Sequence, residues 1–258
     1  MQNILIQRFK VTFNGTPPWA WPFEPPIPLV GRNYRPGKRL LIYASAENLS
    51  WFNESTPPPR FSGNKAWNRY RVVYEQSGRY SEDFFPDVGI QPMTDGGLLV
   101  AGLFIAGKYG LPQRARPRSF LETIAVSNWC KFSIRSGTNR DYIRDVKKLT
   151  ASLPFVVGEL TLLRPVVVLI PKPVWAHPIL QAAMRGASPQ SQFLPVPQFN
   201  ANVVNCHLGK YDRAARRLQK QLTGTPLDRW MENLHRINKN YAWRYIAMLD
   251  KVTHLKSI

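Results

Sequence analysis

The 258-residue sequence has little cysteine and no long apolar run. Its two cysteines, Cys130 and Cys206, cannot supply four thiolates for an iron–sulfur or zinc site, and they cannot form a disulfide framework. Such sparse cysteine is typical of a reducing compartment. No stretch approaches the ~20 consecutive apolar residues that span a bilayer, and the N-terminus lacks the residue order of a signal peptide. We therefore expect a cytoplasmic protein without a membrane partner.

Acidic residues are also scarce, because 16 Asp and Glu face 35 Lys and Arg and leave a formal net charge of +19. A folded domain with this excess repels itself unless it meets a polyanion. Binding to phosphates is favoured because it releases condensed counterions. The charge agrees with a ribosomal, a membrane-surface or a nucleic-acid-enzyme role. The alternative is a basic protein without such a partner.

The basic residues are concentrated in three portions of the chain, residues 1–80, 108–148 and 205–258, whereas residues 81–107 contain no Lys or Arg. A disordered basic tail would be poor in aromatic residues. Here 8 Trp, 10 Tyr and 13 Phe are spread among the charges. We therefore expect a folded protein that gathers its basic portions onto one face.

Proline is abundant, with 23 residues. The clusters at 16–28 and 56–59 favour extended loops, because proline lacks the backbone donor and fixes φ. A rigid surface connection is the simpler interpretation, and a ligand for a proline-binding partner is the alternative. No repeat or long linker divides the chain. We expect one domain over residues 1–258, with a Pro-rich N-terminal extension (1–38) packed on it and a C-terminal helix within 223–258.

Apolar runs without alternation predict buried parallel strands, and runs with helical spacing predict helices between them. The strands are expected at 39–44, 123–130, 165–170 and 202–206, and the helices at 96–106, 142–153, 156–163 and 211–222. Thr225-Pro-Leu-Asp228 is typical of a cap that opens the last helix. This order predicts a three-layer α/β/α fold with a central, mainly parallel four-stranded sheet.

Ligands in such folds bind at the carboxyl ends of the strands. Polar or titratable residues follow each predicted strand: Ser45-Ala-Glu-Asn48, the segment 131–140, the segment 171–177, and His207-Leu-Gly-Lys-Tyr211. The sequence therefore predicts a polar site at one edge of the sheet.

Three pieces of the sequence resemble the uracil-DNA glycosylase superfamily. Ser127-Asn-Trp-Cys-Lys-Phe, followed by Asn139-Arg140, is similar to the segment in which a strand-end Asn reads the base edge. Glu159-Leu-Thr-Leu-Leu-Arg-Pro165 is similar to the helix-to-strand step of the family, and His207 to the residue that opens its second catalytic motif. Together the pieces span roughly residues 39–222 and indicate a divergent member.

The sequence departs from the family pattern at two points. The first family motif is a Gly-x-x-Pro turn with the water-activating group, whereas Ala44-Ser-Ala-Glu-Asn48 has neither the Gly nor the Pro. His207 is followed by Leu208-Gly209 instead of Pro-Ser. The four-cysteine version of the family is excluded by the cysteine count.

Hydrolysis of an N-glycosidic bond needs an activated water and stabilisation of the departing base. Glu47 is the only carboxylate directly after the first strand and is the candidate that activates the water. A loop carboxylate paired with an Arg is the alternative, and the rivals for its role are Asp83, Asp87 and Asp95. Asp87 and Asn48 are also candidates for contacts to the base.

By the resemblance, Asn128 would read the edge of a flipped base and His207 would donate to the base oxygen as charge builds. A turn-capping Asn and a structural His are the alternatives. The expected DNA contacts come from the helix start after His207 and from the opposite rim: Arg140, Leu208, Lys210, Tyr211 and Arg213. Leu208 or Tyr211 would fill the gap left by the flipped nucleotide. A solvated basic face is the alternative for the cations.

These features predict a monomeric DNA glycosylase without a metal or other cofactor, which acts on double- or single-stranded DNA and leaves an abasic site. The expected substrate is a uracil-like, damaged or modified base, and a phage-modified base would imply defence in place of repair. The alternatives are a catalytically inactive nucleic-acid-binding protein with the same fold and an RNA-associated structural protein.

Overall fold

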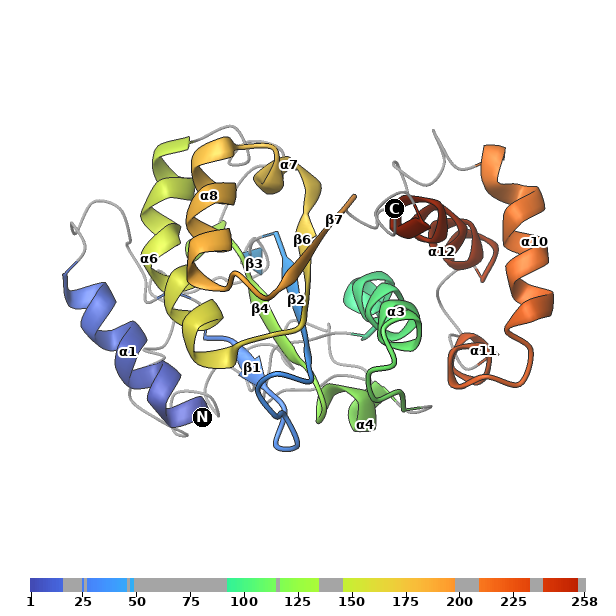
Figure 1. Cartoon of the computed structure of the whole chain (residues 1–258), viewed down its shortest axis with the longest axis horizontal. Helices are drawn as coiled ribbons and strands as arrows, with labels where there is room; N and C mark the ends of the chain where they lie inside the picture. The colour runs from blue at the N-terminus through green and yellow to red at the C-terminus, as the bar shows by residue number, and fades with distance from the viewer. Residues whose placement is uncertain are drawn as a thin grey trace.

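The computed structural model describes residues 1–15, 25, 27–45, 47–48, 92–114, 117–134, 146–197, 209–232 and 239–254. Helices lie on both faces of a central sheet (Figure 1). The sheet has the order β1-β4-β2-β6-β7. Its strands are β1 (Leu29–Val30), β2 (Leu40–Ala44), β4 (Ala125–Asn128), β6 (Val167–Pro171) and β7 (Gln192–Val196). The α/β class predicted from the sequence is confirmed.

The predicted mainly parallel four-stranded sheet is wrong in the number of strands, because the described residues form a mixed sheet of five strands. The strands β2, β4, β6 and β7 are parallel, whereas β1 pairs antiparallel with β4. Three of the four predicted strands are confirmed as β2, β4 and β6. The fourth, at 202–206, lies outside the described residues. The outermost parallel strand is β7, which contains Pro195 and therefore lacks the sequence pattern of a buried strand.

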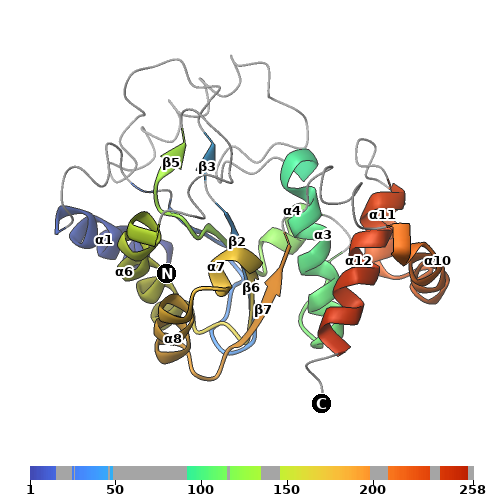
Figure 2. The same cartoon turned by 90° about the horizontal axis from the view of Figure 1, so that it is seen from above.

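One face of the sheet is covered by α1 (Gln2–Asn14), α6 (Val146–Leu163) and α8 (Pro178–Ala187), as Figures 1 and 2 show. Phe9 of α1 contacts Phe155 of α6 edge to face, with 5.1 Å between the ring centroids. The prediction of two helices at 142–153 and 156–163 is wrong, because α6 runs through Pro154. Burial of Leu149, Phe155 and Leu160 on one stripe outweighs the lost backbone hydrogen bond.

The other face is covered by α3 (Pro92–Lys108), which contains the predicted helix 96–106. Gly102 lets α3 approach β2 closely, since a Cβ there would lie 2.4 Å from Cδ1 of Ile42. An outer layer packs on α3 and consists of α10 (Asp212–Gln221), α11 (Pro226–Glu232) and α12 (Lys239–His254). The short elements are β3 (Glu47–Asn48), α4 (Pro117–Leu121), β5 (Ser133–Ile134), α7 (Lys172–Trp175) and the 3₁₀ turn η3 (Gly209–Tyr211).

The cap predicted at residue 225 is confirmed. The backbone N–H of Asp228 donates to Oγ1 of Thr225 at 3.3 Å, and the Asp228 carboxylate accepts from the N–H of Gly224 at 2.9 Å. The predicted last helix begins here as α11, and α12 is a separate element, with residues 233–238 outside the described part of the chain. None of the described helices is long and apolar enough to span a membrane.

Two glycine substitutions should have opposite effects on stability. A Cβ at Gly31 would lie 2.3 Å from the backbone of Glu122, whereas none of the surrounding atoms lies within 4 Å of a Cβ at the exposed Gly186 of α8. We expect Gly31→Ala to lower the free energy of unfolding by about 1 to 3 kcal/mol. Gly186→Ala should raise it by about 0.5 to 1 kcal/mol through helix propensity. Urea unfolding measures both, and destabilisation by Gly186→Ala would contradict the packing described for α8.

Candidate functional site

The carboxyl ends of β2 and β4 lie side by side, with Ala44 opposite Asn128 in the parallel register. The two segments that follow these strands stay paired beyond the sheet. The N–H of Trp129 donates to the carbonyl of Ala44 at 2.9 Å, and the N–H of Cys130 to that of Ser45 at 2.8 Å. The parallel pair β3–β5 then places Glu47 opposite Ser133, and Figure 2 shows this pair beyond the end of the main sheet. The predicted residues Glu47 and Asn128 are thus carried by adjacent segments at the same edge.

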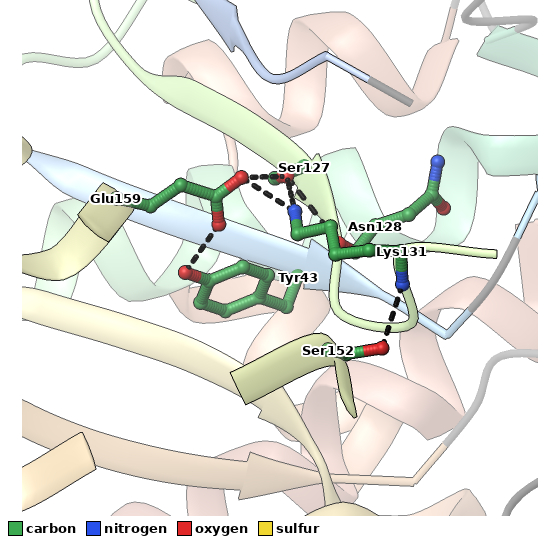
Figure 3. Close-up of polar contacts among 6 residues, drawn as sticks. All are labelled: Tyr43, Ser127, Asn128, Lys131, Ser152 and Glu159. Atoms are coloured by element: carbon green, nitrogen blue, oxygen red, sulfur yellow. Dashed lines mark hydrogen bonds and ion pairs between the residues drawn. The ribbon is translucent and has the colours of Figure 1, made fainter. Parts of the chain in front are cut away.

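A buried polar cluster lies at the end of β4 and joins this edge to α6 (Figure 3). Lys131 and Glu159 form an ion pair, and the side chains of both are 0% exposed. Ser127 accepts a hydrogen bond from Nζ of Lys131 at 2.7 Å and donates to Oε1 of Glu159 at 2.8 Å. The hydroxyl of Tyr43, on β2, donates to Oε2 of Glu159 at 2.7 Å. The cluster therefore ties β2, β4 and α6 together through both carboxylate oxygens.

Aromatic rings and one further hydrogen bond enclose the Lys131 side of the cluster. Nζ of Lys131 lies 5.3 Å from the ring centroid of Phe9 and 5.8 Å from that of Tyr43. The backbone N–H of Lys131 donates to Oγ of Ser152 on α6 at 3.0 Å. Burial of an isolated ammonium is costly, so the position of Lys131 depends on the Glu159 carboxylate.

Burial sets the protonation behaviour of the cluster. It lowers the pKa of Lys131, and the adjacent Glu159 carboxylate opposes that shift. Burial raises the pKa of Tyr43 well above its usual value, and the charge and hydrogen bond of Glu159 raise it further. The phenol of Tyr43 consequently stays protonated at neutral pH and remains a donor to Glu159.

The side chain of Asn128 points away from the ion pair, as Figure 3 shows. Asn128 is half-buried, whereas the neighbouring Ser127 is buried in the cluster. Within the described part of the chain, the Asn128 side-chain amide has no hydrogen-bond partner. Its donor and its acceptor can therefore both face a ligand at the sheet edge.

The other predicted site residues divide into three groups. Glu47 and Asn48 form β3, and the structure describes their backbone. Lys210, in η3, and Arg213, at the start of α10, are exposed. The residues Asp83, Asp87, Arg140, His207 and Leu208 lie outside the described residues. Glu47 and Asn128 therefore lie on adjacent segments at one edge, whereas the place of His207 stays a prediction.

Tyr211, one of the two residues predicted to fill the gap left by a flipped nucleotide, lies in η3. It is half-buried and packs against the core that α3 and the outer helices share, and Nζ of Lys210 lies 5.4 Å from its ring centroid. The wedge role of Tyr211, like that of Leu208, stays a prediction.

The predicted polar segment after β6 is a packing element. It folds into α7, and the Trp175 ring stacks on Phe193 of β7 with 4.9 Å between centroids. The guanidinium of Arg185 covers the same ring at 5.3 Å. The site at the edge is thus centred on β2 and β4. Among the described residues, no three His, Cys, Asp or Glu side chains gather where they could hold a metal ion.

Sequence reasoning did not find the Lys131–Glu159 pair, although both residues lie within the segments that carry the resemblance. A signal was present: each is a lone charge in an otherwise apolar run, Trp129-Cys-Lys-Phe132 and Val156-Val-Gly-Glu-Leu160. Two opposite charges in buried elements are expected to pair, because neither can be buried alone.

A double-mutant cycle on Lys131 and Glu159 should give strong coupling. Lys131→Met leaves the Glu159 carboxylate buried without its cation, and we expect a loss of about 3 to 5 kcal/mol in the free energy of unfolding. Lys131→Met combined with Glu159→Gln removes both charges and should be more stable than the sum of the single losses implies. Urea unfolding of the four proteins tests this, and additive losses would exclude a structural role for the ion pair.

The thiol of Cys130 should make stability depend on alkaline pH. Burial raises its pKa from the ordinary value of 9.0 to about 12, against the smaller opposing effect of Lys131. Above pH 9 the unfolded chain therefore loses a proton that the folded chain keeps. The stabilisation from the neutral buried thiol is complete below pH 9 and is lost between pH 9 and 12.

Comparison of the wild type with Cys130→Ala measures this effect. The difference in free energy of unfolding should fall by about 1 kcal/mol between pH 8 and 10. A difference that stays constant over this range would show that the thiol is accessible to solvent in the folded protein.

Comparison with protein families, curated proteins and solved structures found no match to this chain. The charge of the chain and the geometry of this sheet edge are therefore the features that bear on its function.

Proposed function

We propose that this protein is a DNA glycosylase that hydrolyses the N-glycosidic bond of a base turned out of the stack. The observation that supports the proposal most strongly is that adjacent segments carry Glu47 and Asn128 at the carboxyl edge, through the Ala44–Asn128 register and the β3–β5 pair. A carboxylate and an amide at one edge of the sheet are two of the groups that the reaction needs.

In the proposed reaction, the sugar develops positive charge as the base departs. Glu47 orients and deprotonates the attacking water on one side of the sugar. Asn128 holds the base edge through its amide, and His207, two residues before η3 in the sequence, donates to the base oxygen as negative charge builds there. The products are the free base and an abasic site.

The buried cluster gives this arrangement the rigidity that such chemistry requires. Lys131 follows Asn128 by three residues, and its side chain and backbone N–H are both held by partners on or against α6. The turn between them is fixed to β2 by the hydrogen bonds of Trp129 and Cys130. Asn128 thus lies between two fixed points, which limits the freedom of its side chain relative to the base.

The alternative is a protein that binds nucleic acid without cleaving it. Ala44-Ser-Ala-Glu-Asn48 lacks the Gly and Pro of the motif that it resembles, and this departure favours the alternative. The two functions differ in one measurable property, the release of a base.

Base release from uracil-containing, deaminated and phage-modified DNA, followed by alkaline strand cleavage, tests the proposal. We expect one of these substrates to give abasic sites. Asn128→Ala should lower the single-turnover rate by about 10²- to 10³-fold, through loss of a group that contacts the departing base, and Glu47→Gln should lower it as well. Asn33→Ala is the matched control, because Asn33 is an exposed Asn at the other end of the sheet, beside β1.

Salt-dependent DNA binding without base release on any substrate would reject the glycosylase and support the protein that only binds nucleic acid. An equal loss of rate in Asn33→Ala and Asn128→Ala would exclude the sheet edge as the active site. Unfolding curves of the variants separate lost chemistry from lost folding.

A further inference from the structure

Four cationic side chains form a continuous stripe along α10, here called the α10 ridge: Arg213, Arg216, Arg217 and Lys220. At about 100° per residue, the four side chains fall within an arc of about 100° on the helix. All four residues are exposed. The stripe extends for about 10 Å along the helix axis, at a rise of about 1.5 Å per residue.

The opposite side of α10 is fully used in packing. Ala215 and Leu218 are buried, and Ala214 and Leu222 pack on the same core. This side contacts α12, and Figure 1 shows α10 at the outside of the molecule. The helix is therefore anchored through its apolar side, and the ridge faces solvent.

Acidic side chains do not neutralise the ridge within the described part of the chain. Asp212 is the only acidic residue of α10, and it forms an ion pair with Arg244 of α12. Among the described residues, none forms an ion pair with the four cations of the ridge. The positive charge of this surface is thus left for an external partner.

We propose that the α10 ridge is a second nucleic-acid site, which binds the phosphate backbone of a duplex independently of sequence. This inference rests on the proposed function in one respect, which is that the partner is DNA. Duplex DNA carries about one charge per 1.7 Å of axis, so the length of the ridge faces about six phosphates. An anionic membrane is a poorer fit, because surface helices bind membranes by inserting an apolar side, and that side of α10 is packed on α12.

The ridge is separate from the sheet edge. α10 packs on α12 and shares a cavity with α3, α12 packs on α3, and α3 packs on β2, so α3 lies between the ridge and the sheet. Figure 2 shows the same succession from above. A short duplex held at the edge is therefore not expected to reach the ridge, whereas a long duplex or a second segment of DNA can occupy both.

The test compares two double variants that remove the same charge. The ridge variant is Arg216→Gln and Lys220→Gln; Arg213 is kept because it is one of the DNA contacts expected beside His207, and Arg217 because it also lines a cavity of about 480 Å³ beside α3. The control is Lys10→Gln and Arg35→Gln, two exposed cations on α1 and in the turn before β2. Gln is close to Arg and Lys in helix propensity, so both variants should fold, and thermal unfolding checks this.

Fluorescence anisotropy with a random duplex of about 30 base pairs, between about 50 and 200 mM salt, gives the slope of log K against log salt. The ridge variant should lose about 2 units of slope, close to 0.9 for each phosphate contact, and the control variant less than 1. Equal losses in the two variants would overturn the proposal, because binding would then follow net charge alone. Binding to phosphatidylserine vesicles that the ridge variant loses, with no change on the duplex, would overturn it in favour of a membrane.

Base release on a saturating duplex of about 10 base pairs keeps the two proposals apart. The ridge variant should retain the single-turnover rate on this substrate, because the sheet edge is unchanged. Absence of base release in the wild type and in both variants would reject the glycosylase. If the ridge variant still showed the loss of slope, the proposal that the ridge binds a duplex would be retained. Loss of the rate in the ridge variant would overturn the claim that the ridge is a separate site.

Discussion

The buried ion pair between Lys131 and Glu159 is the constraint on which the rest of the site depends. Neither side chain reaches solvent, so each charge has a compensating partner only while the other remains within contact distance. An apolar pair could slide or repack at small cost. An ion pair in a dry environment cannot, because a small displacement leaves two unsatisfied charges. The end of β4 is therefore fixed against α6 with a precision that hydrophobic packing alone does not provide.

Because side chains alternate along β4, the fixed position of Ser127 determines the face of the sheet to which the Asn128 side chain points. Ser127 bonds to both members of the ion pair, so its side chain points toward α6. The next residue of a strand must point to the opposite face, and the side chain of Asn128 accordingly points away from the cluster (Figure 3). Tyr43 bonds to the same carboxylate from β2, so the neighbouring strand, which leads to Glu47, is held in the same way. A structural cluster on one side of the sheet thus orients Asn128 at its edge and holds the strand that leads to Glu47.

The elements that the sequence predicts well are those whose pattern is determined by their own residues. The fully apolar runs of β2 and β6, and the four cations of α10 on one arc, follow from composition and period alone. The elements that it does not predict are decided by their neighbours. β7 contains Pro195 and is a strand because β6 pairs with it, and α6 continues through Pro154 because its apolar stripe is buried.

The same distinction applies to the site. Polar residues after parallel strands predict a site at the carboxyl edge, and the meeting of Glu47 and Asn128 agrees with that rule. The β3–β5 pair, two residues on each side, is too short to leave a pattern in the sequence. The ion pair joins residues 28 positions apart, and nothing local in either segment specifies its partner. Only the packing of α6 on the sheet brings the two charges together.

The shortage of acidic residues has a further consequence once the structure is known. The carboxylates whose side chains the structure describes already have partners: Glu122 with Arg32, Glu159 with Lys131, Asp212 with Arg244, Asp250 with Lys108, and Asp228 in the cap of α11. Each internal pair neutralises one of 16 acidic and one of 35 basic side chains. Pairing therefore uses a larger fraction of the acidic side chains than of the basic ones. The surface that remains is more strongly cationic in proportion than the sequence as a whole. On α10 this leaves four cations beside one acid that is already engaged, and a phosphate backbone is the partner that supplies opposite charges at a comparable density.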